Sequence, residues 1–186
     1  MQTWHANISR GALAKRAHQI NRIRTFFDEQ GLVEVFTPYL SPYAVTDPHT
    51  HSWKACGDFS HQSAYLHTSP ELEMKRMLSR GSGDIFQICQ VFRDNEHGRI
   101  NSNEFTMLEF YRVGFGMHQL IDEIKDLLVI LGKDDSIKQM SYSEAFFEFA
   151  NIDILNSSIE DLKKILNAHS LNSDYEWIED MQTVLF

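Results

Sequence analysis

The sequence predicts an α+β fold in which antiparallel strands are flanked by helices. Residues 84–93 and 104–113 are its two most strand-like runs, and only a polar loop separates them, which favours antiparallel pairing. Stretches with apolar residues at helical spacing stand before and after this pair. At 186 residues, 42% of them hydrophobic, the chain is long enough for one domain with a sizeable core.

The first third of the chain predicts a helix, a strand and a long loop, in that order. Apolar residues recur at helical spacing over residues 13–27, and basic residues fall mostly on the other side. Gly31 is suited to stop this helix. Residues 32–40 have the composition of a strand closed by Pro38, and residues 41–63 have that of a loop.

The middle of the chain predicts a helix on each side of the strand pair. Residues 63–70 have the pattern of a short strand, and Pro70 is the expected first residue of a helix that stops at Gly81. Residues 117–131 predict an amphipathic helix. Because two strands follow one another directly, this order differs from the strict alternation of a wound parallel sheet.

The sequence changes character near residue 136. Three short helices are predicted over residues 141–152, 157–169 and 173–186. Ser157 and Glu160 have the spacing of a capping box at the start of the second of these helices. We therefore expect two segments, residues 1–135 and residues 136–186.

The net charge and the cysteine content of the chain limit which partners and which cellular compartment suit it. A formal net charge of −9 counts against a nucleic acid as the principal partner, because proteins that grip a phosphate backbone usually carry a basic excess. No apolar run is long enough for a membrane span, and the N-terminus lacks the apolar core of a signal peptide. The two cysteines form no paired motif, which suits a reducing cytoplasm.

A carboxylate, Glu109, stands in the middle of the second strand-like run. Side chains alternate faces along a strand, so one face carries Phe105, Met107, Glu109 and Tyr111. An ionised acid on a buried face needs a cation or several hydrogen-bond donors. One interpretation is that Glu109 and Tyr111 hold a ligand ammonium, beside an anion held by Arg93. The other is a structural salt bridge from Glu109 to Arg93 or Arg112.

Three stretches together resemble one enzyme family. The run "FRDNE…NEFTMLEFY" resembles motif 2 of class II aminoacyl-tRNA synthetases, in the form that lysyl-tRNA synthetases use. The run "TSPELEMKRML" resembles the segment that precedes motif 2, and the helix that ends at Gly31, followed by "VEVFTP", resembles motif 1. The resemblance extends from residue 12 to about residue 186. It implies the N-terminal half of a class II catalytic domain over residues 1–135, with a partial antiparallel sheet, and a helical insertion over residues 136–186.

Within this family the chain resembles the short paralogues that attach a lysine-type amino acid to elongation factor P. Motif 1 begins near residue 13, which leaves no room for an N-terminal anticodon-binding barrel, and "VTDPH" matches a run that the paralogues carry after motif 1. The resemblance implies activation of lysine or β-lysine with ATP and Mg²⁺ through an aminoacyl-adenylate, and transfer to elongation factor P. It also implies a homodimer formed through motif 1. A lysyl-tRNA synthetase fragment and a non-catalytic class II paralogue that dimerises or binds a ligand remain the alternatives.

The resemblance also implies roles for individual residues. Arg93 would act in catalysis by contacting the α-phosphate of ATP, and Phe105 would stack on the adenine. The nucleotide site implied by the motif comprises Arg93, Asp94, Asn95, Ser102 and Phe105. Glu109 and Tyr111 would bind the side-chain ammonium of the lysine-like substrate, and Glu71, within the segment Ser69–Pro70–Glu71, would bind its amino group. Lys75 and Arg76 either orient phosphates or form a solvated helix face.

The chain departs from the family pattern in three places. Asn95 stands where the family has a glutamate, with Glu96 beside it as a possible substitute, and Asn101 stands where the family has a histidine. The sequence ends before motif 3, so we expect a fragment or truncated product with exposed apolar surface, self-association and weak or absent catalysis.

No metal-ligating side chain is predicted. The loop histidines His49, His51, His61 and His67 surround Cys56, but their spacings match no closed zinc module.

Overall fold

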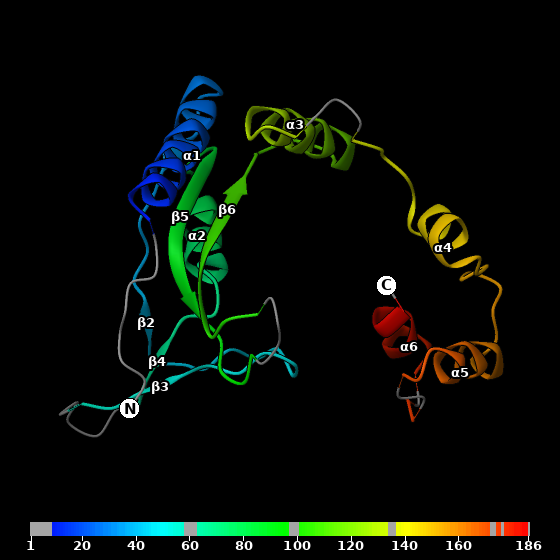
Figure 1. The fold of residues 1–186 in the computed structure, drawn as a ribbon. Coiled ribbons are helices and arrows are strands. Elements are labelled where there is room, and N and C mark those ends of the chain that lie inside the picture. Colours follow the sequence, from blue (N-terminus) through cyan, green and yellow to red (C-terminus); the bar gives the residue numbers. More distant parts are fainter. Residues whose placement is uncertain are drawn as a thin grey trace. The chain divides into compact units, whose positions relative to one another are not determined.

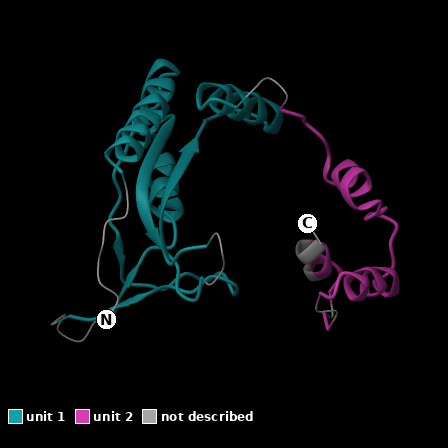
Figure 2. Ribbon diagram, viewed as in Figure 1, with its two compact units in different colours: residues 1–135 teal, residues 136–186 magenta. Residues whose placement is uncertain are grey.

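The computed structural model describes residues 9–57, 63–96, 101–133, 137–171, 174–175 and 177–185. The chain divides into two compact units, residues 1–135 and residues 136–186, and each is described by itself (Figure 2). Helices and strands are mixed as the α+β prediction requires (Figure 1). None of the helices in the described ranges is both long enough and apolar enough to cross a membrane.

The first unit contains three helices and six strands among its described residues (Figure 1). They are α1 (Arg10–Glu29), β1 (Val33–Glu34), β2 (Leu40–Ser41), β3 (Lys54–Ala55), β4 (Ala64–Leu66), α2 (Glu71–Ser79), β5 (Ile85–Phe92), β6 (Glu104–Tyr111) and α3 (Met117–Ile130). The predicted helix stops at Gly31 and Gly81 are confirmed, because each glycine follows its helix with a positive φ, of 79° and 83°. Pro70 is the N-cap of α2 rather than its first helical residue.

The larger sheet has the strand order β1-β5-β6. Strands β5 and β6 are antiparallel along their whole length, from the pair Ile85 and Tyr111 to the pair Phe92 and Glu104. This confirms the antiparallel pairing expected from the polar loop. Strand β1 adds to β5 in the parallel direction.

The prediction of one strand over residues 32–40 is wrong. Its start, β1, pairs with β5, whereas its end belongs to β2 in a second sheet with the order β2-β4-β3. Pro38 lies between the two strands and has no N–H to donate to a ladder, so a single strand cannot run through it. The predicted loop over residues 41–63 is also interrupted, because β3 pairs with β4.

An aromatic core covers one face of the larger sheet. Phe27 of α1 is fully buried, and its ring lies 4.9 Å from that of Phe86 on β5 and 5.0 Å from that of Phe110 on β6. Phe26, Leu32 and Leu127 complete the buried cluster, with Ile88 and Leu108 packed against it. Because side chains alternate along β5 and β6, this packing turns Glu109 and Tyr111 to the opposite face.

The second unit contains α4 (Tyr142–Ala150), α5 (Ile159–Ala168) and α6 (Ile178–Leu185), which confirms the three predicted short helices. Its core is a separate cluster formed by Phe146, Ile152, Ile154, Leu162, Leu166 and Met181. Asn151 ends α4 in the left-handed conformation, with φ of 55°, and Asn tolerates this region better than most residues.

The predicted capping box at Ser157 and Glu160 is wrong by one residue. Ser158 is the N-cap of α5; its Oγ accepts a hydrogen bond from the Asp161 N–H, and the Asp161 carboxylate accepts one from the Ser158 N–H. Ser157 instead donates its hydroxyl to the Asp153 carbonyl at 2.7 Å. Both serines precede an acid by three residues, so spacing alone could not separate the two registers.

Ser158→Ala is expected to destabilise the second unit by about 1 kcal/mol, because the first turn of α5 loses its side-chain cap. Ser157→Ala is the matched control and should cost less, since it removes one exposed hydrogen bond outside the helix. Hydrogen exchange of the α5 amides measures both. Equal loss of protection in the two variants would contradict the assigned cap.

Candidate active site

Strands β5 and β6 carry the candidate site on the face that turns away from the aromatic core. Opposite residues in the ladder share a face, so Phe105, Met107, Glu109 and Tyr111 lie across from Val91, Cys89, Gln87 and Ile85. The β5 residues of this face are buried, and Glu109 and Tyr111 are partly buried. The strand pairing therefore places an acid and a phenol side by side on a largely apolar surface.

Glu109 and Tyr111 are hydrogen-bonded to each other. The Tyr111 hydroxyl donates to Glu109 Oε1 at 2.6 Å. Burial raises the pKa of the Glu109 carboxyl; the Tyr111 hydrogen bond opposes that shift, and the nearby Glu71 carboxylate adds to it. Burial and the contact with Glu109 likewise raise the pKa of Tyr111. The carboxylate is therefore held in an environment that favours an incoming positive charge.

Neither of the two candidate arginines forms an ion pair with Glu109. Arg112 contacts Asp84 at 3.1 Å and Glu123 at 3.2 Å. Arg93 donates from Nε to the Thr68 carbonyl at 3.3 Å. The interpretation of Glu109 as half of a structural salt bridge with Arg93 or Arg112 is therefore wrong, because both guanidinium groups are engaged elsewhere.

Arg93 lies just beyond β5 and close to Phe105. Its guanidinium carbon is 5.2 Å from the centroid of the Phe105 ring, within the range of a cation–π contact. Its backbone N–H donates to the Asn103 carbonyl at 2.9 Å, which fixes the strand end against the return of the chain. The guanidinium of this partly buried residue is held by the Thr68 carbonyl and by the Phe105 ring.

Ser69, Pro70 and Glu71 form the entry to helix α2. Pro70 is buried, and the Glu71 N–H donates to Ser69 Oγ at 3.4 Å. The Glu71 carboxylate is exposed and forms an ion pair with Lys75 one turn later, with Nζ and Oε1 2.5 Å apart. The Glu71 carboxylate also raises the pKa of Glu109.

A cavity of about 630 Å³ is lined by some of the predicted site residues but not by others. Ser69, Glu71 and Arg93 line it, together with much of the segment from residue 38 to residue 52. The lining does not include Phe105, Glu109 or Tyr111, which lie on the strand face. The two groups are linked by the electrostatic effect of Glu71 on Glu109 and by the contact of Arg93 with Phe105.

The remaining nucleotide-site predictions lie outside this cavity. Asp94 pairs with His51 as an isolated antiparallel bridge, and Ser102 is exposed. Asn95 has a φ of 63°, a conformation in which asparagine is enriched and glutamate is not. The Glu96 carboxylate accepts a hydrogen bond from Asn101 at 3.1 Å, so it is held within its own loop.

Sequence reasoning missed the polar residues that support the site from distant segments. Gln87, directly across from Glu109, is 1% exposed and donates to Thr37 Oγ1 at 3.0 Å over a separation of 50 residues. His67, considered only for metal binding, contacts the Gln90 carbonyl through Nε2 at 2.7 Å and stacks on Tyr39. His61 lies outside the described residues. No local spacing signals these two hydrogen bonds, because each joins residues that are 23 or 50 positions apart in the chain.

The sequence profile described as tRNA synthetases class II (D, K and N) matches residues 2–181. The chain belongs to this class II synthetase family. Its mixed sheet with flanking helices is a partial class II domain.

Relatives within the class II family carry a common name, elongation factor P--(R)-beta-lysine ligase. The proteins of that name from Avibacterium paragallinarum, Haemophilus influenzae and Vibrio vulnificus are 44%, 42% and 41% identical to the chain. Each alignment covers 98% of this chain but only 57–58% of the relative. The chain thus spans a little under three fifths of the length of these class II relatives.

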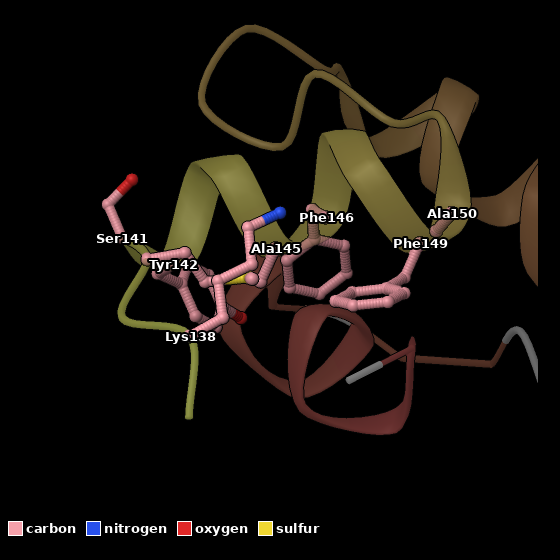
Figure 3. Close-up of a pocket in the computed structure, with 8 residues that line it drawn as sticks. Lys138, Ser141, Tyr142, Ala145, Phe146, Phe149 and Ala150 are labelled. Atoms are coloured by element: carbon pink, nitrogen blue, oxygen red, sulfur yellow. The ribbon is translucent and has the colours of Figure 1, made fainter. Parts of the chain in front are cut away.

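A second cavity, of about 700 Å³, lies in the second unit (Figure 3). Figure 3 shows Phe146 and Phe149 projecting from the same side of α4 into it. Its one charged lining residue, Lys138, is paired with Glu148. The cavity contains none of the predicted site residues of this class II chain, although it is the larger of the two.

Proposed function

We propose that the chain binds lysine or β-lysine and ATP as part of a ligase that forms an aminoacyl-adenylate and transfers the amino acid to elongation factor P. The observation that carries this proposal is the Glu109–Tyr111 pair, a partly buried carboxylate hydrogen-bonded to a phenol and not to an arginine. The names of the class II relatives support the amino acid and the acceptor protein.

The Glu109 carboxylate selects for a positively charged side chain. Burial raises its pKa, and a ligand ammonium would supply the missing countercharge and lower that pKa again. A substrate with a neutral side chain would leave the carboxylate desolvated and unpaired, which is the strongest way in which a polar site rejects an analogue.

Arg93 and Phe105 are the residues proposed to receive the nucleotide. A fixed guanidinium stabilises negative charge that develops on the α-phosphate as the amino-acid carboxylate attacks, and the phenylalanine ring offers a flat surface to the adenine. Mg²⁺ would neutralise the triphosphate. It is commonly held by one or two carboxylates together with substrate phosphates, so this role requires no dedicated protein cage.

The partner proposals follow from charge and from exposed apolar residues. The net charge of −9 favours a protein acceptor over a tRNA. Leu13, Val33 and Phe36, on and around the segment that resembles motif 1, are more than half exposed, which supports homodimerisation through that segment. The cytoplasm is the compartment in which elongation factor P and ATP would both be met.

Isothermal titration of the 186-residue chain with a non-hydrolysable lysyl-adenylate analogue tests the proposal. The leucyl-adenylate analogue is the matched control, because it has the same nucleotide and a neutral side chain of similar size. We expect the lysyl analogue to bind at least about tenfold more tightly, the value of one charge-assisted contact. Equal affinities, or no binding of either compound, would refute the proposed substrate class.

Arg93→Gln is expected to weaken binding of the lysyl-adenylate analogue about tenfold, because the variant loses one charge-assisted contact to the phosphate mimic. Lys125→Gln is the control, because Lys125 is paired with Asp122 on α3 and neither residue lines the cavity. Affinity for free lysine should not change in either variant. A loss that is as large for lysine as for the adenylate analogue would contradict the phosphate role.

A further inference from the structure

Lys75 forms an ion pair with Glu71, the carboxylate that we propose binds the substrate amino group. Its Nζ lies 2.5 Å from Glu71 Oε1, and both side chains are about half exposed, at 55% for Lys75 and 49% for Glu71. Glu71 lines the 630 Å³ cavity beside Ser69 and Arg93, whereas Lys75 is not among the lining residues. The lysine therefore pairs with an acid of the cavity lining without being part of that lining itself.

The same ammonium also acts on the second acid of the site. Lys75 and His67 lower the pKa of Glu109, while Glu71 raises it. Lys75 thus acts on both carboxylates as a positive charge from the protein itself. It carries the same chemical group, a primary ammonium on an aliphatic stem, as the proposed amino-acid substrate.

We propose that Lys75 is an internal stand-in for the substrate amino group, holding Glu71 in the free chain and leaving it when the substrate binds. The inference rests on the proposed function and concerns how that site is occupied before substrate arrives. Half-exposed ion pairs at this helical spacing are weak, so a better-placed ammonium can displace this one. A ligand without the second amino group cannot replace the Lys75 ammonium on Glu71. Lys75 therefore determines how much affinity the second amino group of the substrate adds.

Lys75→Met tests the exchange, because methionine keeps an unbranched stem and a high helix propensity but carries no charge. The ligands are the lysyl-adenylate analogue and its 6-aminohexanoyl counterpart, which keeps the side-chain ammonium and lacks the second amino group. We expect the lysyl analogue to bind about two- to fivefold more tightly to the variant, as displacement of an exposed pair implies. The 6-aminohexanoyl analogue should gain less, because Lys75 affects it only through the charge that Lys75 exerts on Glu109.

Lys125→Met is the matched control, since Lys125 forms a helical ion pair with Asp122 on α3 and neither residue lines the cavity. It should leave both affinities unchanged. Lys75→Gln should reproduce the gain if Lys75→Met perturbs folding. An unchanged or weaker lysyl affinity in the Lys75 variants would overturn the inference. So would an equal gain for both ligands, or a gain in Lys125→Met, since either indicates a general charge effect.

Failure of this inference and failure of the proposed function can be told apart. If Glu109→Gln leaves lysyl-analogue affinity unchanged, or the unmodified chain does not bind the analogue, the proposed function fails and the Lys75 exchange fails with it. If Glu109→Gln removes binding and Lys75→Met gives no gain, the substrate class stands and only the Lys75 exchange is wrong.

Discussion

Glu109→Gln is expected to weaken binding of a lysyl-adenylate analogue about ten- to 150-fold, because a hydrogen bond to a charged group contributes about 1.5–3 kcal/mol. The glutamine keeps the shape of the side chain, and its carbonyl can still accept the hydrogen bond from Tyr111. The variant therefore removes the charge and preserves the packing. A leucyl-adenylate analogue should lose its disadvantage in the same variant, so the ratio of the two affinities should approach one.

The same substitution is expected to stabilise the unliganded chain at neutral pH. Burial raises the pKa of Glu109 in the folded chain, so the stability linked to this group is fully present below its unfolded pKa and is lost as pH rises through the folded pKa. Glu109→Gln and the unmodified chain should be equally stable in acid, and the variant should become the more stable as pH rises to neutral.

Urea unfolding of the first unit at a series of pH values measures how the difference in stability between the two proteins grows with pH. Glu160→Gln, an exposed position on α5 of the other unit, is the control and should leave the pH dependence of the first unit unchanged. A variant that is less stable than the unmodified chain at neutral pH would show that the Glu109 carboxylate is structural. The ammonium site would then be the wrong interpretation.

Arg112→Met is expected to destabilise the first unit by about 3–5 kcal/mol, the usual cost of leaving a buried charge without its partner. Only 9% of the Arg112 side chain and 6% of the Glu123 side chain are exposed. Arg112 contacts Asp84 at 3.1 Å and Glu123 at 3.2 Å, the latter a charge contact without hydrogen-bond geometry. It also donates to the Gln30 carbonyl at 3.0 Å and lies 4.3 Å from the Phe115 ring centroid.

One side chain thus joins the end of β6 to the end of α1, to α3 and to the turn before β5. Adding Glu123→Gln to Arg112→Met should recover part of the lost stability, because the unpaired charge is then absent. Burial raises the pKa of Glu123, and Arg112 lowers it. Removing Arg112 therefore raises that pKa further, and the destabilisation should shrink as pH falls and Glu123 takes up a proton.

Thermal and urea unfolding at two pH values test the Arg112 cluster, with Arg76→Met as a surface control that should cost about 0–1 kcal/mol. If Arg112→Met costs no more than this control, Arg112 is not the centre of a buried network. A loss that does not shrink in acid would show that the cost comes from lost packing against Phe115 instead of from the Glu123 charge.

Local patterns in the sequence were sufficient for the strand pair and its two faces. The period of two along residues 104–111 fixes which side chains share a face, and the polar loop fixes the antiparallel direction. The sequence alone therefore places Glu109 and Tyr111 on the same face. The helix stops at Gly31 and Gly81 were equally local, since each depends on one residue with a positive φ.

The structure was needed where two local patterns predicted different helix starts, or where a strand's partner lay far away in the chain. Ser157 and Ser158 both precede an acid by three residues, and only the start of α5 chooses between them. The run over residues 32–40 looked like one strand, yet Pro38 separates two short strands whose partners, β5 and β4, lie much later in the chain.

The sequence by itself determined the α+β class, the strand face that carries Glu109 and Tyr111, and the likeness to the class II family. Only the tertiary structure decided that Arg112 turns to Glu123 and Asp84, that Arg93 is held by Thr68, and that Glu109 keeps no arginine partner. The physical reason is the range of the interactions. Backbone periodicity directs a side chain from its nearest neighbours, whereas a charge takes whichever partner the packing of distant segments brings within a few ångströms.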